Sequence, residues 1–187
     1  MSRVPPRGKA ASSRRDRIVA VLTRRRVALG FAFAAMVLWL AQPTRDSLLA
    51  GSSVAALGEA LRIWAAGHVE KSREVTRSGP YRFTRHPLYL GSCVIGAGIV
   101  IASASWVVSA LVFSYLAVTL SAAVRAEEAH LREKFGPEYD AYAGNLAPPM
   151  VRSFSMARAL ANREHHALAG LAVALALLAL KVGLSIR

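Results

Sequence analysis

Cysteine is nearly absent from this chain, since Cys93 is the single cysteine in 187 residues. One thiol excludes a disulfide within the chain, and no Cys/His spacing suitable for zinc occurs. We expect Cys93 itself to be buried filler in an apolar segment. A glycine fingerprint for dinucleotides is also missing, because Gly96-Ala97-Gly98 falls inside a long apolar run rather than after a strand.

Charged residues are scarce as well. They make up 19% of the chain, whereas hydrophobic residues make up 54% and gather into long runs. This composition is typical of a membrane protein rather than a soluble domain. The formal net charge of +13 does not indicate DNA binding, because the basic residues cluster beside apolar runs, where they suit anionic lipid headgroups. The sequence therefore predicts an all-α integral membrane helical bundle, with membrane lipids and no nucleic acid as partners.

The beginning of the chain is a basic tail. Residues 1–26 hold nine Lys/Arg and one acid, Asp16, and show no apolar periodicity over most of their length. We expect this tail to be disordered. A secretory signal peptide is the alternative, since the apolar run 27–41 follows, but no small-x-small cleavage pattern comes after that run. Residues 27–187 are then predicted to form the membrane domain.

Five apolar runs are candidate membrane spans, so we expect about five transmembrane helices. The runs are 27–41, 48–66, 87–103, 106–124 and 167–180. The third and fourth are predicted to form a helical hairpin that turns at Ala104-Ser105. The fifth is short and rich in alanine, so lying along the membrane interface is an alternative to spanning it.

Lys and Arg are distributed unevenly between the loops. Residues 1–26, 67–86 and 125–166 carry nine, five and six of them, whereas Arg45 stands alone in the short turns 42–46 and 103–106. The positive-inside rule therefore predicts that the N-terminus and both long polar segments are cytoplasmic. The expected location is a membrane of the bacterial inner-membrane type.

Two charges interrupt the second apolar run. Glu59 and Arg62 are three residues apart and so lie on one helix face. Charges inside a membrane helix are costly unless they are paired or face a cavity. A mutual ion pair near the interface and a role facing a ligand both remain open.

A polar stretch, 79–91, lies between apolar runs. Pro80 and Pro87 each remove a backbone donor, so it cannot be one continuous helix. Pro87 suits the first turn of a new helix, with His86 just ahead of it. Segment 125–142 is polar and helix-prone, with a break at Gly136-Pro137. In the predicted topology these two segments share one membrane face, where they can hold a small charged ligand.

These segments contain a specific combination of motifs. It comprises Ser78-Gly79-Pro80-Tyr81, Arg85-His86-Pro87-Leu88-Tyr89-Leu90-Gly91, Glu127-Glu128, Leu131, Phe135-Gly136, Tyr139 and Tyr142. The combination closely resembles the isoprenylcysteine carboxyl methyltransferase family and the related phospholipid methyltransferases. The resemblance covers core motifs within residues 62–152.

The resemblance implies a methyltransferase that binds S-adenosyl-L-methionine at the cytosolic membrane face without a Rossmann domain. It implies cofactor contacts from the residues around the polar stretch and from the acidic pair: Val75, Thr76, Tyr81, His86, Pro87, Leu88, Tyr89, and one of Glu127 and Glu128. It assigns to Arg125 the catalytic role of orienting the acceptor. No metal is implied.

The methyl acceptor decides which groups the reaction needs. The resemblance favours carboxyl O-methylation of an isoprenylcysteine type, on a lipidic or lipid-attached acceptor. A carboxylate is already the nucleophile, so a dry site and an arginine to aim it suffice. An amine acceptor must lose a proton, for which His86 or a glutamate is a candidate base. A phospholipid amino N-methyltransferase and a non-catalytic membrane adaptor are the alternatives.

Overall fold

The computed structural model describes residues 28, 30–71 and 73–185, so the predicted tail over residues 1–26 lies outside the described residues. The chain divides into two units between Met36 and Val37. Of the predicted first span, the structure shows an apolar helix, Gly30–Leu40. The described residues fold into helices without any strand, which confirms the all-α class.

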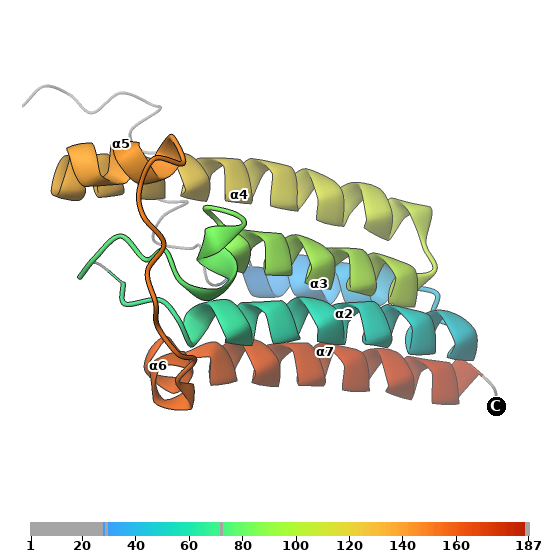
Figure 1. The fold of residues 1–187 in the computed structure, drawn as a ribbon. Coiled ribbons are helices and arrows are strands. Elements are labelled where there is room, and N and C mark those ends of the chain that lie inside the picture. Colours follow the sequence, from blue (N-terminus) through green and yellow to red (C-terminus); the bar gives the residue numbers. More distant parts are fainter. Residues whose placement is uncertain (1–27, 29, 72, 186–187) are drawn as a thin grey trace, which may run out of the picture. The chain divides into compact units, whose positions relative to one another are not determined.

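The second unit is a bundle of helices (Figure 1). Its elements are α2 (Arg45–Ala66), the 3₁₀ helix η1 (Gly79–Arg82), α3 (Pro87–Ser103), α4 (Trp106–Phe135), α5 (Pro137–Ala143), α6 (Met156–Ala161) and α7 (Glu164–Ser185). Helix α2 packs most extensively against α3 and also contacts α7, while α3 packs against α4. Helices α2, α4 and α7 are long and apolar enough to cross a membrane, whereas Gly30–Leu40 and α3 are apolar but shorter.

Local sequence signals set the helix boundaries, as predicted. His86 is the N-cap of α3 and Pro87 its first residue, after the separate turn η1. Ala104 ends α3 in the left-handed conformation, with φ of 47°, and Ser105 caps α4. Gly136, with φ of 49°, separates α4 from α5, which begins at Pro137. Both the hairpin turn and the predicted break are confirmed.

The contact between α2 and α3 depends on glycine. A Cβ atom on Gly98 would lie 2.5 Å from the backbone nitrogen of Ala55, and one on Gly51 would lie 2.4 Å from the carbonyl oxygen of Gly98. Real Cβ atoms do not come this close to backbone, so the two helices approach at a distance that only glycine permits. Gly96 lies elsewhere on α3, against Leu116 of α4.

Two expectations about apolar segments are corrected. Cys93 is exposed rather than buried. Gly91 faces α2, and Cys93 lies two positions further along the same helix. Residues two positions apart on an α-helix project to nearly opposite sides, so Cys93 points away from α2. Helix α7 also extends beyond the predicted run 167–180, through Lys181 to Ser185. The Lys181 ammonium donates hydrogen bonds to the carbonyl oxygens of Leu38 and Trp39 at 2.9 and 2.7 Å, so it caps a helix end instead of terminating its own helix.

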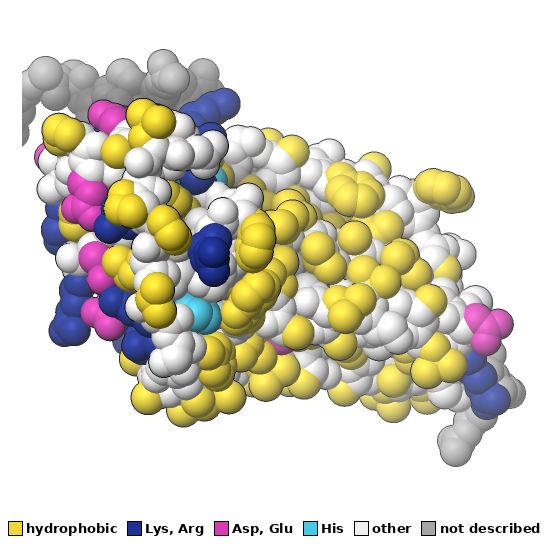
Figure 2. Space-filling view, in the orientation of Figure 1, with side chains coloured by type: hydrophobic (Ala, Val, Ile, Leu, Met, Phe, Trp, Pro, Cys, Tyr) yellow, Lys and Arg dark blue, Asp and Glu magenta, His cyan; other side chains and the backbone are white. Residues whose placement is uncertain are grey.

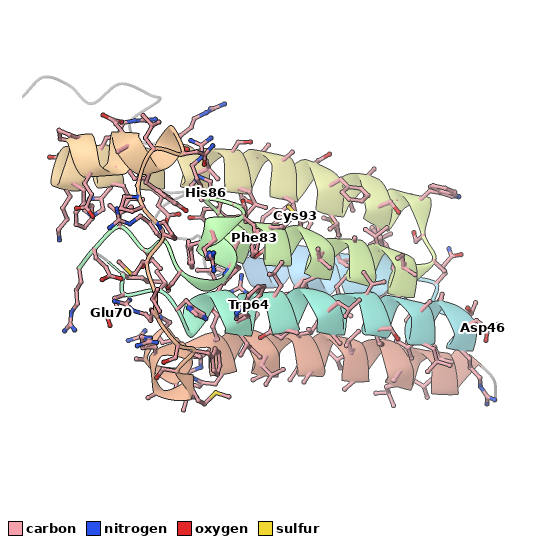
Figure 3. All side chains as sticks on the ribbon, in the orientation of Figure 1. Asp46, Trp64, Glu70, Phe83, His86 and Cys93 are labelled. Atoms are coloured by element: carbon pink, nitrogen blue, oxygen red, sulfur yellow. The ribbon has the colours of Figure 1, made fainter. Side chains whose placement is uncertain are left out.

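The two short turns lie together at one end of the second unit. The Gln42 amide donates to the Ser103 carbonyl oxygen at 2.7 Å, and the Ser47 hydroxyl donates to that of Ala102 at 3.2 Å. Asp46 marks this end, opposite Glu70 and His86 (Figure 3). Charged side chains gather at the Glu70 end, and hydrophobic ones cover the helices (Figure 2). Which end faces the cytoplasm stays a prediction.

Candidate functional site

The polar end of the second unit joins three segments that are distant in sequence. They are the loop 67–86, the polar part of α4 and the short helix α5. The Tyr142 hydroxyl of α5 donates a hydrogen bond to the carbonyl oxygen of Tyr81 in the loop at 2.9 Å. Tyr139 is buried beside Tyr142, with ring centroids 6.2 Å apart. Helix α5 thus fastens the loop to α4.

Glu128 of α4 is held by three nitrogen donors. Its Oε1 atom lies 3.2 Å from His86 Nε2 and 3.5 Å from an Arg85 guanidinium nitrogen. Its Oε2 atom lies 3.4 Å from Arg132 Nη1. The His86 ring also stacks on Tyr89, with centroids 5.7 Å apart. The His86 loop and the acidic pair therefore meet, as the predicted topology requires.

Glu127 is in a different environment. Its side chain is 45% exposed, against 21% for Glu128. Its Oε2 atom lies 3.9 Å from His86 Nδ1. It lines a cavity, and Glu128 is not among the lining residues of that cavity. The acidic pair is thus divided between one ion-paired carboxylate and one that faces open space.

This cavity, of about 190 Å³, brings together four predicted cofactor residues, Val75, Thr76, Tyr81 and Glu127. Its other lining residues include Glu70, Glu74, Arg85 and Tyr142. We call it the acidic cavity because three glutamates line it. Burial raises the pKa of Tyr142 to about 12 and that of Tyr81 further still, so both hydroxyls stay neutral at physiological pH.

A larger cavity of about 510 Å³ shares Tyr81, Arg85 and Tyr142 with the acidic cavity. Arg77 and Arg82 also line it, and no carboxylate is among its described lining residues. We call it the arginine cavity. Its charge favours an anion, in contrast to that of its neighbour.

The other predicted site residues lie outside these two cavities. His86, Pro87, Leu88 and Tyr89 are not among the described residues that line either one. They form the start of α3 and its contact with the acidic pair. The structure does not bring Arg125 to the cavities either: its side chain is exposed on α4. Arg125 precedes Glu127 by two helical positions, about 200° around the helix, so the two project in opposite directions.

A segment after α5 braces the loop, and sequence reasoning missed it. Arg152 forms a two-pronged ion pair with Glu74, next to Val75 and Thr76, and also donates to the His68 carbonyl oxygen at 3.3 Å. Further along, Arg158 donates to the Gly67 carbonyl oxygen at 2.9 Å. These residues bind backbone atoms and two loop acids, Glu74 and Glu70, that are distant in sequence, so no local sequence pattern marks them.

His68 lies inside this brace. Its Nδ1 atom is 3.1 Å from the Ser78 hydroxyl oxygen, and its side chain is buried. Burial lowers the pKa of His68 below its ordinary value, and the nearby guanidinium groups of Arg158 and Arg152 lower it further. The ring is therefore neutral in the folded loop.

Residues 26–138 match the phospholipid methyltransferase family. Over 107 residues the chain is also 31% identical to the nickel-cobalt-cadmium resistance protein NccN of Alcaligenes xylosoxydans xylosoxydans, an alignment that covers 56% of this chain and 48% of that protein. The chain therefore spans about half the length of this relative. No solved structure matches it. Since the family match covers more than half of the chain, the chain belongs to the phospholipid methyltransferase family.

Proposed function

On the basis of this family membership, we propose that the protein transfers a methyl group from S-adenosyl-L-methionine to an anionic, lipidic or lipid-attached acceptor. One observation carries the proposal. Val75, Thr76, Tyr81 and Glu127, which the family resemblance assigns to the cofactor, line a single cavity although they come from the loop and from α4.

The chemistry of the acidic cavity fits the cofactor, which supplies a methyl group on a sulfonium cation. Glu127 provides the negative charge, because Glu70 and Glu74 are ion-paired with Arg152, and the faces of Tyr81 and Tyr142 suit a cation. The cavity's volume of about 190 Å³ is below the roughly 300–1,000 Å³ usual for small-molecule sites. S-adenosyl-L-methionine therefore needs part of the adjoining arginine cavity as well. Arg85 lines both the acidic cavity and the arginine cavity, so its guanidinium group is placed to bind a carboxylate of a ligand in either one.

The two glutamates divide the work. Glu127 faces the acidic cavity and holds the cationic part of the cofactor. Glu128 keeps α4 against the loop through its bonds to His86 and Arg85. His86 is then a positioning residue, and its effect on cofactor binding is indirect.

The arginine cavity supports an anionic acceptor. Arg77, Arg82 and Arg85 can attract and orient a carboxylate or phosphate. An isoprenylcysteine-type carboxylate needs no general base, because it is already the nucleophile. These three arginines, rather than Arg125, are therefore proposed to orient the acceptor. An amine acceptor would require a base, but His86 lines neither cavity and its Nε2 atom is already bonded to Glu128.

The orientation and domain proposals follow from the same placement. We place the polar end in the cytoplasm for two reasons. The long basic loops lie at the polar end, and S-adenosyl-L-methionine is a cytosolic compound. This arrangement makes residues 27–187 one integral membrane domain of the bacterial inner-membrane type, with residues 1–26 as a basic tail.

Transfer can be tested with detergent-purified protein, methyl-labelled S-adenosyl-L-methionine, and a total lipid extract with an added isoprenylated cysteine analogue. We expect a labelled, base-labile ester, identified by mass. Arg85→Gln should reduce transfer, whereas Arg73→Gln should not, because Arg73 is 81% exposed and lines neither cavity. If the label is found on a lipid amine instead, the acceptor is an amine and the proposed carboxylate acceptor is wrong. No labelled product and no cofactor binding would support the non-catalytic adaptor instead.

A further inference from the structure

The chain between α5 and α7 presents apolar side chains on its outer side. Val151 is fully exposed, and Met156 and Leu160 of α6 are 57% and 52% exposed. Met156 and Leu160 are four positions apart, so they lie on one face of the helix. We call Val151, Met156 and Leu160 the outer apolar edge. None of the three lines the acidic or the arginine cavity.

The inner side of the same segment is polar and binds the end of α2. Arg158 Nε donates a hydrogen bond to the Gly67 carbonyl oxygen at 2.9 Å. Asn162 Nδ2 donates to the carbonyl oxygens of Ala66 and Val69 at 2.9 and 3.0 Å. Helix α2 ends at Ala66, and its last turn holds no basic residue of its own. Arg158 and Asn162 therefore supply the donors that the carbonyl groups at this helix end require.

This arrangement reverses the usual pattern of a surface helix. In a globular protein the apolar side chains of such a helix face the core and the polar ones face water. Arg158 lies two positions from both Met156 and Leu160, so it projects to the side opposite the outer apolar edge. Its polar group is satisfied by the protein, while the apolar side chains are left to the surroundings. Such a distribution fits a membrane interface better than bulk water.

The helix that follows indicates that lipid covers the outer apolar edge. Helix α6 lies beside the start of α7 (Figure 1), and Asn162 and Arg163 are the two residues that separate them. Helix α7 is long and apolar enough to cross a membrane, and Leu168 in its second turn is 47% exposed. Exposed apolar surface thus resumes on a candidate span directly after α6. Arg163 is exposed between the two helices, where a cation suits headgroup phosphates.

We propose that residues 151–163 dock on the interface of the membrane that holds the bundle. The outer apolar edge inserts among the upper parts of the acyl chains, and Arg163 lies at the level of the headgroup phosphates. Docking then stabilises the end of α2 and the start of the loop 67–86, because the inner side of the same segment binds them. Family membership gives this segment no role, since it lies beyond the matched residues 26–138. The proposal stands whether or not methyl transfer does.

A nitroxide label on Leu160→Cys, in a Cys93→Ser background, tests the docking. The protein is reconstituted in vesicles of phosphatidylethanolamine and phosphatidylglycerol, and collisions of the label with oxygen and with a water-soluble nickel complex are measured. Oxygen collisions should dominate, at a depth of roughly 5–10 Å, because oxygen concentrates among the acyl chains. The same label on Arg73→Cys should favour nickel, since Arg73 is 81% exposed on the loop. A preference for nickel at position 160 would overturn the docking. Protection from both reagents would also overturn it, because a protein partner or a second copy would then cover the edge.

A charged variant tests whether docking stabilises the end of α2. In the same vesicles, Leu160→Glu should accelerate hydrogen exchange of the amides of residues 67–69, which bond to carbonyl oxygens of α2, by about tenfold. Leu160→Met is the control, because it keeps an apolar side chain, and it should exchange as wild type does. If Leu160→Glu does not fold, Val151→Glu replaces it, since Val151 is fully exposed. Exchange at the wild-type rate in a folded glutamate variant would overturn the link between docking and α2.

Discussion

His86 and Glu128 connect the loop before α3 to the polar part of α4, with His86 Nε2 3.2 Å from Glu128 Oε1. Both side chains are mostly buried, at 18% and 21% exposure, so solvent screens their interaction only partly. The bond spans 42 residues of sequence and holds the loop beside Glu127. It is therefore an element of site architecture rather than of the proposed chemistry.

A double-mutant cycle measures this coupling. His86→Ala and Glu128→Gln should each destabilise the protein, and the double variant should lose less than the sum, with an interaction energy of about 1 kcal/mol. Pairing His86→Ala with Glu133→Gln is the matched control, because Glu133 is an exposed acid on the same helix. Thermal unfolding in detergent gives the four stabilities. If the stability losses of His86→Ala and Glu128→Gln are additive, the two side chains are close together but do not stabilise each other.

Glycine packing between α2 and α3 gives a second prediction. Gly98→Ala should lower the free energy of unfolding by about 1–3 kcal/mol, because the new Cβ would press on the backbone of Ala55 at 2.5 Å. Gly170→Ala in α7 is the control, since nothing lies within 4 Å of a Cβ there. That control should be neutral or slightly stabilising, as alanine favours helix. Similar stability of Gly98→Ala and wild type would show that the helices can separate without cost.

Proline, glycine and capping residues made much of the fold predictable. His86-Pro87, Ala104-Ser105 and Gly136-Pro137 act on their own backbone, so a reader of the sequence can place the boundaries of α3, α4 and α5. The end of α7 was harder to place. Lys181 resembles a helix terminator at a membrane interface, but it caps carbonyl oxygens 142 residues or more away along the chain.

The candidate site was predictable in part for a related reason. Tyr81 and Glu127 belong to motifs with recognisable spacing, and Val75 and Thr76 lie just before the first of these motifs. The structure places all four residues around one cavity. Arg152 and Arg158 belong to no such motif, and their partners in the loop lie at least 78 residues away. Contacts of this range leave no periodic or spacing signal in a single sequence.

The brace suggests a third experiment. Arg152→Gln should loosen the loop around Val75 and Thr76, because it removes both hydrogen bonds to Glu74. Hydrogen exchange of residues 73–78 should accelerate, and cofactor affinity should fall by about tenfold. Arg73→Gln removes an exposed arginine from the same loop and is the control. Unchanged exchange in Arg152→Gln would mean that other contacts position the loop.

Protonation of His68 should make stability depend on pH. Its pKa in the folded protein is lowered from 6.5, chiefly by burial, so below pH 6.5 the unfolded state binds more protons than the folded one. This contribution is complete above pH 6.5 and is lost as the pH falls toward the lowered value. Unfolding temperatures measured from pH 7.5 to 5.5 should therefore decline, and His68→Gln should flatten the decline. An identical slope in His68→Gln would assign it to other groups.

Calorimetric titration of detergent-purified protein with S-adenosyl-L-methionine tests the central claim, that Glu127 faces the cofactor. Losing one charge-assisted hydrogen bond costs about 1.5–3 kcal/mol, so Glu127→Gln should weaken binding about ten- to a hundredfold. Glu133→Gln, an exposed acid six residues further along α4, should bind as wild type does. The account predicts saturable binding by wild type and a selective loss in Glu127→Gln. Absence of binding by wild type, or equal affinity in Glu127→Gln, would contradict it.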